Sequence, residues 1–174
     1  MADFFIVHPS ASVGPDRYAL PKRLDDTLVL LKTMIADCAN PDLKLVLSEY
    51  YPYWDSHGTV KLDNALIIAD MLRVMLEHHD FVIQAQYWDM INAPNHGSIC
   101  SVNGSPHHFY FRTTGLALML FNNYFLGDVQ IQADGYAIPQ SGAYSDVTFI
   151  AAKDDRNAYL VVINKSQFNN YPVR

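Results

Sequence analysis

Two patterns of apolar and polar residues take turns along the first half of the chain. Short apolar runs at residues 3–7, 43–49 and 80–88 have the length of buried strands. Between them, residues 24–38 and 62–79 carry apolar side chains at every third or fourth position, as amphipathic helices do. The order strand, helix, strand, helix, strand predicts a parallel sheet covered by helices. Because the strands are continuously apolar, we expect both faces of the sheet to be buried.

Polar residues indicate a loop before the first helix and a charged side on the second helix. A loop rich in Pro, Gly and Ser is expected to extend from the first strand to Pro21. The polar side of the second helix holds four charged residues: Asp63, Asp70, Arg73 and Glu77. On that side, Glu77 is most simply interpreted as a solvated charge.

The pattern changes after Asn92. Residues 93–108 are rich in Gly and Pro and are predicted to be a loop, and residues 113–126 predict one more helix. Short β-type runs follow, at residues 128–133, 146–152 and 158–166. They predict antiparallel β structure, either a sandwich or part of one. A domain boundary at about residue 125 would divide residues 1–125 from residues 126–174.

The composition narrows the class of protein. Half of the residues are hydrophobic and 17% are charged, which is typical of a globular chain with a packed core. The formal net charge is −6 and no basic stripe occurs, so we expect no nucleic-acid partner. Cys38 and Cys100 form no C-x-x-C motif and indicate neither a zinc site nor a disulfide framework.

The first residues, MADFFIVHPSAS, have the pattern of neither a secretory signal nor a membrane span. We expect no membrane partner, and the sequence leaves the cytoplasmic and secreted compartments both open. A strand that begins so close to Met1 indicates further sequence upstream.

Polar or aromatic residues follow each predicted strand of the parallel sheet. His8 follows the first strand, Glu49 ends the second, and Gln86, Trp88 and Asp89 end the third. Functional residues of parallel α/β proteins gather at the carboxyl ends of the strands. These positions therefore predict an active site at one edge of the sheet.

Glu49 is the strongest single candidate. It is one of only two glutamates, whereas the chain has sixteen aspartates, and it precedes the aromatic segment YYPYW. Sugar rings stack their apolar faces on aromatic side chains, and their hydroxyls need polar partners. The alternative is a structural role, in which Glu49 pairs with an arginine or caps a helix.

The segments KLVLSEYYPYW, LDNALIIADMLRVMLEHHDFV, QAQYWDMINAP and AYLVVINKS, in this order, resemble the retaining (β/α)8-barrel glycosidases. The likeness is greatest to the α-L-arabinofuranosidases of glycoside hydrolase family 51, and it covers nearly the whole chain. The resemblance implies an α/β fold, with the last strands and helices of a (β/α)8 (TIM) barrel followed by an antiparallel β-sandwich domain. It also implies a carbohydrate substrate from plant-type polysaccharides or oligosaccharides, and a homo-oligomer.

The resemblance also implies roles for individual residues. Glu49 matches the catalytic nucleophile of the family, and His8 matches an active-site histidine. The family often has a tyrosine two residues beyond that histidine, but Ser10 stands here. The implied substrate-binding residues are His8, Tyr50, Trp54 and Trp88, with Gln86 or Asp89 at the position of a sugar-binding glutamine.

The implied reaction is a double displacement that needs a second carboxylic acid as general acid/base. In the family this acid lies in an Asn-Glu pair on an earlier strand, and the chain contains no such pair. We therefore expect the acid/base outside this chain. The alternatives are a non-catalytic carbohydrate-binding module and an inactive structural fragment whose open half-barrel would oligomerise.

The sequence gives little indication of a metal site or a cofactor site. His78-His79 and His107-His108 are adjacent pairs that lack a helical i, i+4 partner, so their imidazoles point in different directions. No Gly-rich phosphate loop is present. We predict neither a metal nor a cofactor.

Overall fold

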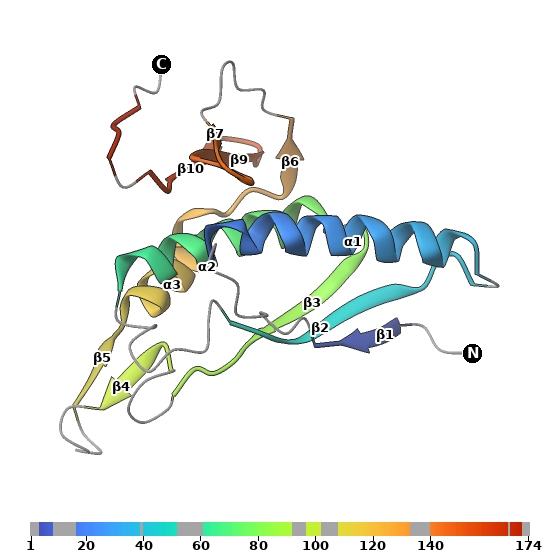
Figure 1. The fold of residues 1–174 in the computed structure, drawn as a ribbon, viewed down its shortest axis with the longest axis horizontal. Helices are drawn as coiled ribbons and strands as arrows, with labels where there is room; N and C mark the ends of the chain where they lie inside the picture. Colours follow the sequence, from blue (N-terminus) through green and yellow to red (C-terminus); the bar gives the residue numbers. More distant parts are fainter. Residues whose placement is uncertain are drawn as a thin grey trace.

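The computed structural model describes residues 4–8, 17–38, 40–51, 61–91, 97–101, 108–132, 140–166 and 168–171. Its first half is a parallel sheet with the strand order β1-β2-β3, formed by Phe4–Val7, Lys44–Tyr50 and Val82–Tyr87. The helices α1 (Leu20–Ala36) and α2 (Leu62–Glu77) lie between consecutive strands in the sequence and on one side of the sheet (Figure 1). The predicted alternation of strands and helices and the parallel pairing are confirmed.

Helix α1 begins earlier than the sequence pattern predicts. A 3-10 turn at Arg17–Ala19 leads directly into the helix at Leu20, with Pro21 in the first turn. Proline is tolerated there because the first backbone N–H groups of a helix have no intrahelical acceptor. The prediction that a loop extends to Pro21 was therefore wrong.

The main core lies between the sheet and the two helices. Leu28 of α1, Leu45 and Leu47 of β2 and Ile67 and Val74 of α2 are almost completely buried and belong to one apolar cluster. The cluster also contains Met71 and Met75, four residues apart on α2. This is the helix face that the apolar spacing predicts.

The face of the sheet away from the helices is partly exposed, although Val46 of the central strand is buried. Phe4 and Ile6 of β1 are 47% and 57% exposed, and Ile83 of β3 is 55% exposed. The expectation that both faces are buried in this chain was therefore wrong. The apolar run of a strand therefore does not by itself show that both of its faces are buried.

The segment after β3 contains a short hairpin, where a loop was predicted. β4 (Ile99–Ser101) pairs with β5 (Phe109–Phe111) in antiparallel register, directly before α3 (Thr113–Tyr124). Strands of three residues are too short to show a periodic pattern. The hairpin packs tightly against α3, because a Cβ atom added to Gly115 would lie only 2.5 Å from the carbonyl oxygen of Ser98.

The last part of the chain forms an antiparallel sheet with the order β10-β9-β6, as the sequence predicts. It comprises Ala158–Asn164, Val147–Lys153 and Val129–Ile131, and a further two-stranded pair joins β7 (Gln140–Ser141) to β8 (Tyr144–Ser145). This sheet lies across the helices from the parallel sheet (Figure 1).

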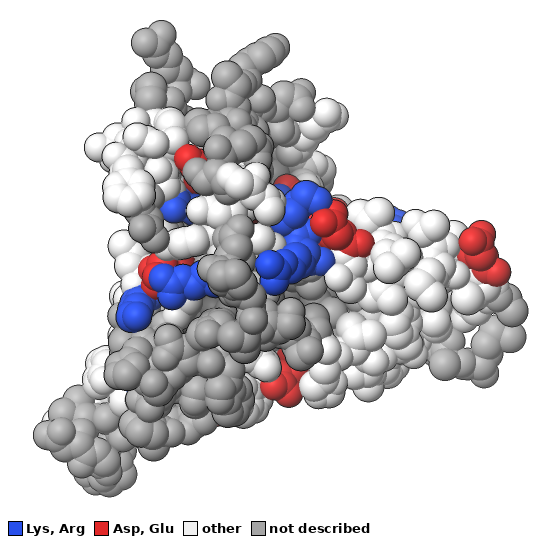
Figure 2. Space-filling model, in the orientation of Figure 1, with Lys and Arg blue, Asp and Glu red and all other residues white. Residues whose placement is uncertain are grey.

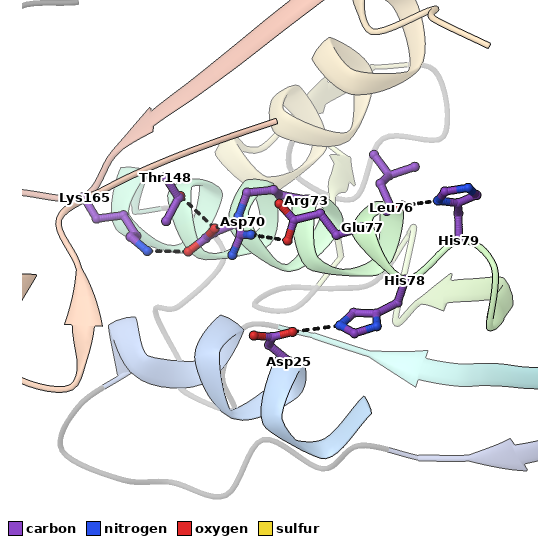
Figure 3. A network of polar contacts seen from close by, with 9 residues as sticks. All are labelled: Asp25, Asp70, Arg73, Leu76, Glu77, His78, His79, Thr148 and Lys165. Atoms are coloured by element: carbon purple, nitrogen blue, oxygen red, sulfur yellow. Dashed lines mark hydrogen bonds and ion pairs between the residues drawn. The ribbon is translucent and has the colours of Figure 1, made fainter. Parts of the chain in front are cut away.

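A buried polar cluster attaches the antiparallel sheet to α2. The carboxylate of Asp70 accepts hydrogen bonds from the Lys165 ammonium, from Thr148 Oγ1 at 2.8 Å and from Arg73 Nε at 2.6 Å (Figure 3). The side chains of Asp70 and Lys165 are 1% and 2% exposed. Asp70, which was expected on the polar side of the helix, is thus buried against the antiparallel sheet, and Glu77, which was interpreted as a solvated charge, is paired with Arg73.

Three carboxylates outside the candidate site, those of Asp70, Asp80 and Asp154, have lowered pKa values. Burial alone would raise the pKa of Asp70, but the positive charges of Arg73 and Lys165 outweigh it and hold this pKa below the usual 3.8. In the turn between β9 and β10, Tyr159 and the backbone N–H groups of Arg156 and Asn157 donate to Asp154 and lower its pKa to about 2.

These shifts predict acid sensitivity. A carboxylate whose pKa is lower in the folded protein stabilises the fold above its unfolded-state pKa, and this contribution is lost as the pH falls through the folded-state pKa. We therefore expect the free energy of unfolding, measured by urea denaturation at a series of pH values, to fall below about pH 4. The fall should be shallower in Asp70→Asn, and an equal slope in the variant would contradict the assignment to Asp70.

Candidate active site

The parallel register brings the predicted site residues to one edge of the sheet. Val7 pairs with Leu47, which places His8 level with the end of β2. On the other side of β2, Tyr50 pairs with Tyr87, after an irregularity that follows Leu47. The ends of β1, β2 and β3 therefore meet at the same edge.

Glu49 and His8 face each other across the ends of β2 and β1. Oε2 of Glu49 lies 3.5 Å from Nε2 of His8, and the two side chains are 27% and 65% exposed, respectively. On the other side of the ring, Nδ1 of His8 lies 3.0 Å from Oγ of Ser48. The Glu49 carboxylate is thus partly exposed to solvent beside the His8 imidazole, and Ser48 contacts the other nitrogen of that imidazole. A carboxylate in this position could attack a small molecule bound at this edge of the sheet.

Two aromatic rings lie against each other where β2 and β3 end. The backbone N–H of Trp88 donates to the carbonyl oxygen of Tyr50 at 3.0 Å and so holds the end of β3 against β2. The rings of Tyr51 and Trp88 lie 5.6 Å apart at an angle of 57°. Both residues are half-buried, so they offer apolar surface to a ligand without closing the site.

Tyr50 was predicted to bind the sugar, but its side chain lies in the main core. Its side chain is 3% exposed, belongs to the main core, and meets Tyr87 edge-on with the ring centres 5.5 Å apart. Burial, together with the neighbouring Tyr87, raises the pKa of its hydroxyl above the usual 10.0. The structure thus places Tyr50 in the core beside the site, and Tyr51 beside Trp88.

The remaining predicted residues lie at the end of β3 or beyond the described part of the chain. Gln86 is exposed, and Asp89 is half-buried after a cis peptide bond that joins it to Trp88. Oδ1 of Asp89 is buried and has no hydrogen-bond partner among the described residues. This oxygen is thus a buried acceptor that does not face solvent in the structure. Trp54 lies outside the described residues.

Sequence reasoning missed two residues of this arrangement. Ser48 contacts His8, and Tyr51 contacts Trp88. A signal for Ser48 was present, because a hydroxyl interrupts an apolar strand immediately before Glu49. Tyr51 could not be separated from Tyr50, because only the irregular register at the end of β2 decides which ring turns outward.

A large apolar cavity adjoins this edge, with Tyr50 and Tyr87 among its lining residues. It has a volume of about 680 Å³ and lies between α2, α3 and β3, where Leu72, Leu118 and Phe121 are among the lining residues. None of its lining residues carries a carboxylate or an imidazole, and Glu49 is not among them. The candidate active site is therefore the edge around Glu49 rather than this cavity.

The adjacent histidines have structural partners. Nε2 of His78 lies 2.7 Å from Oδ1 of Asp25 on α1, and Nδ1 of His79 donates to the carbonyl oxygen of Leu76 at 3.0 Å (Figure 3). His107 lies outside the described residues. Within the described ranges, no three His, Cys, Asp or Glu side chains are grouped as metal ligands would be.

The surface shows no single charged stripe on the face that is drawn. Basic and acidic side chains lie next to one another over the described part of that face (Figure 2). Of the helices that the structure describes, none has the length and apolar character needed to cross a membrane.

Comparison with known proteins gives a clear likeness in fold. No family model and no curated protein sequence matches the chain. Among solved structures, the thermostable family 51 α-L-arabinofuranosidase of Thermotoga petrophila RKU-1 matches 93% of this chain with a TM-score of 0.74 and 16% identity. An α-L-arabinofuranosidase from Thermotoga maritima matches 93% with a TM-score of 0.73 and 17% identity. A family 51 enzyme from Bifidobacterium longum matches 94% with a TM-score of 0.73 and 13% identity.

The match covers almost all of this chain but only part of the known enzymes. The chain spans 38% of each Thermotoga structure and 40% of the Bifidobacterium one. The resemblance that the sequence motifs predict is therefore confirmed for the fold, which is a mixed α/β arrangement. At 13–17% identity, the likeness leaves activity and substrate to be argued from the residues themselves.

Proposed function

We propose that this chain is the C-terminal portion of a retaining glycosidase, similar to the α-L-arabinofuranosidases, in which Glu49 is the nucleophile. Residues 1–125 would complete a (β/α)8 catalytic barrel, and residues 126–174 would be part of a C-terminal β-sandwich. The observation that carries the proposal is the closeness of Glu49 to His8 at the carboxyl edge of the parallel sheet, where Oε2 lies 3.5 Å from Nε2.

The geometry around Glu49 suits the first half of a double displacement. A nucleophilic carboxylate must reach the anomeric carbon, and Glu49 is partly exposed at the strand end. The rings of Tyr51 and Trp88 offer apolar surface for a sugar face. The substrate would be an arabinofuranoside or a related glycoside of plant-type polysaccharides or oligosaccharides.

The partly exposed face of the sheet supports the barrel part of the proposal. In a closed barrel, side chains on the inner face of the strands fill the interior in layers. Phe4, Ile6 and Ile83 are exposed here on the face away from the helices, and their apolar character suits such an interior. Further strands of the same protein would cover them and would bring the general acid/base to about 5–5.5 Å from Glu49.

Covalent trapping tests the nucleophile without requiring that acid. We would expose the chain to 2-deoxy-2-fluoro glycosides, in the arabinofuranosyl, xylosyl and glucosyl series, with a 2,4-dinitrophenolate leaving group. The carboxylate forms an ester bond to the anomeric carbon as the phenolate departs with its bonding electrons, so no proton is needed. The fluorine slows the second step, and the adduct accumulates.

We expect one sugar adduct per chain, which peptide mass spectrometry assigns to Glu49. An adduct on another carboxylate would contradict the assignment of the nucleophile. If no adduct forms but oligosaccharides bind in isothermal titration calorimetry, the chain acts as a carbohydrate-binding module instead.

A further inference from the structure

Ser48 connects the ends of β1 and β2 through its hydroxyl group. Oγ of Ser48 donates to the carbonyl oxygen of Val7 at 3.2 Å and lies 3.0 Å from Nδ1 of His8. Val7 is the last residue of β1 and His8 follows it directly, while Ser48 directly precedes Glu49 on β2. The hydroxyl therefore contacts the imidazole from the side opposite the Glu49 carboxylate.

The two contacts of this hydroxyl restrict where the ring proton can lie. A serine hydroxyl has one hydrogen to donate and two lone pairs that accept, and a carbonyl oxygen can only accept. If the hydrogen is used toward Val7, the oxygen of Ser48 is left to accept a hydrogen bond from Nδ1–H of His8. Both short contacts are then satisfied together, whereas donation to Nδ1 would leave the Val7 contact without a hydrogen.

We propose that Ser48 is a positioning residue, which orients His8 and keeps the proton of the neutral imidazole on Nδ1, so that an unprotonated Nε2 faces Glu49. The separation of 3.5 Å between Nε2 and Oε2 fits this arrangement, because it is longer than the 2.7–3.2 Å typical of a donated hydrogen bond. The value of this arrangement to the reaction rests on the proposed function of Glu49.

The assigned proton position has two consequences for that function. A carboxylate that accepts no hydrogen bond from the neutral imidazole keeps its lone pairs for attack on the anomeric carbon. The lone pair on Nε2 can in turn accept a hydrogen bond from a sugar hydroxyl, which orients the sugar beside the nucleophile. Ser48 acts only through His8 and is not itself a catalytic residue.

The proton position can be measured directly, independently of any activity. We would record nitrogen-15 NMR spectra of the histidine-labelled chain at about pH 9, where imidazoles are neutral, and assign the His8 signals with the variant His8→Gln. The protonated ring nitrogen resonates far upfield of the unprotonated one. We expect Nδ1 to carry the proton in the unchanged chain, whereas free imidazoles favour Nε2.

Variants of Ser48 then test whether its hydroxyl is the cause. Ser48→Ala should move His8 toward the Nε2-protonated form, and Ser48→Thr, which keeps the hydroxyl, should retain the Nδ1-protonated form. Thr33→Ala is the matched control, because it removes a hydroxyl that donates to the Val29 carbonyl oxygen on the exposed side of α1. A proton on Nε2 in the unchanged chain, or no change in Ser48→Ala, would overturn the proposal.

The rate of covalent trapping adds a functional measurement. We expect Ser48→Ala to be labelled about tenfold more slowly, which is the effect of one lost hydrogen bond, and Ser48→Thr to recover the rate. Affinity for the glycoside should change less than the rate. If the unchanged chain is not labelled at all, the proposed function fails, but the NMR spectra still decide the role of Ser48. Equal labelling rates in all variants would show that the proton position has no bearing on the reaction.

Discussion

Glu49→Gln is expected to abolish covalent trapping and to lower the turnover of a 2,4-dinitrophenyl glycoside by about 10⁴-fold or more. An amide has nearly the same shape as the carboxylate, but it lacks the charge and lone-pair basicity needed to form the glycosyl ester. Because Glu49 is partly exposed and lies beside the exposed His8, the substitution should leave the fold intact. Circular dichroism and the thermal midpoint would verify that the variant is folded.

Glu77→Gln provides the matched control for this prediction. It alters the only other glutamate of the chain, at the end of α2, where the carboxylate pairs with Arg73. This position is not at the carboxyl edge of the parallel sheet, so trapping and turnover should be unchanged. Trapping that persists in Glu49→Gln, or that disappears in Glu77→Gln, would remove Glu49 from its proposed role.

Asp70→Asn is expected to lower the free energy of unfolding by about 3–5 kcal/mol, the usual cost of breaking a buried ion pair. The substitution leaves the Lys165 ammonium, which is 2% exposed, without its carboxylate partner. Arg73 retains Glu77 and is less affected. Since Asp70 belongs to α2 while Lys165 follows β10, the loss should loosen the antiparallel sheet from the helices. Urea denaturation followed by tryptophan fluorescence and circular dichroism would measure both effects.

Two further variants separate the ion pair from general damage. The double variant Asp70→Leu with Lys165→Met replaces both charges with apolar groups and should recover most of the lost free energy. Asp26→Asn breaks an exposed pair with Lys22 on α1 and should leave the denaturation midpoint nearly unchanged. A small effect of Asp70→Asn, comparable to that of Asp26→Asn, would show that Lys165 finds another partner or becomes hydrated.

The strands and helices follow closely from local sequence patterns. The apolar runs predicted β1, β2 and β3 to within two residues, and the spacing of apolar residues predicted α2 from Leu62 and α3 from Thr113. These elements are visible in the sequence because each must bury one continuous apolar face. Pro21 and the segment before β5 were misinterpreted, because proline suits the first turn of a helix and a three-residue strand has no period of its own.

The candidate site was only partly visible in the sequence. The positions of His8, Glu49 and Trp88 at strand ends follow from parallel strand order alone, since all the carboxyl ends meet at one edge. The roles of Ser48 and Tyr51 depend on distances between strands, namely 3.0 Å from Ser48 Oγ to His8 Nδ1 and 5.6 Å between the Tyr51 and Trp88 rings. No local pattern encodes such distances.

The sequence by itself determined the alternation of strands and helices, the antiparallel character of the last sheet and the edge at which polar groups gather. Hydrophobic periodicity and strand direction are local properties, and they suffice for these conclusions. Only the tertiary structure decided that Asp70 is a buried partner of Lys165, 95 residues away, and that Tyr50 turns into the core. A charged or aromatic residue has the same local pattern whether it meets water or a distant partner, so only packing settles its environment.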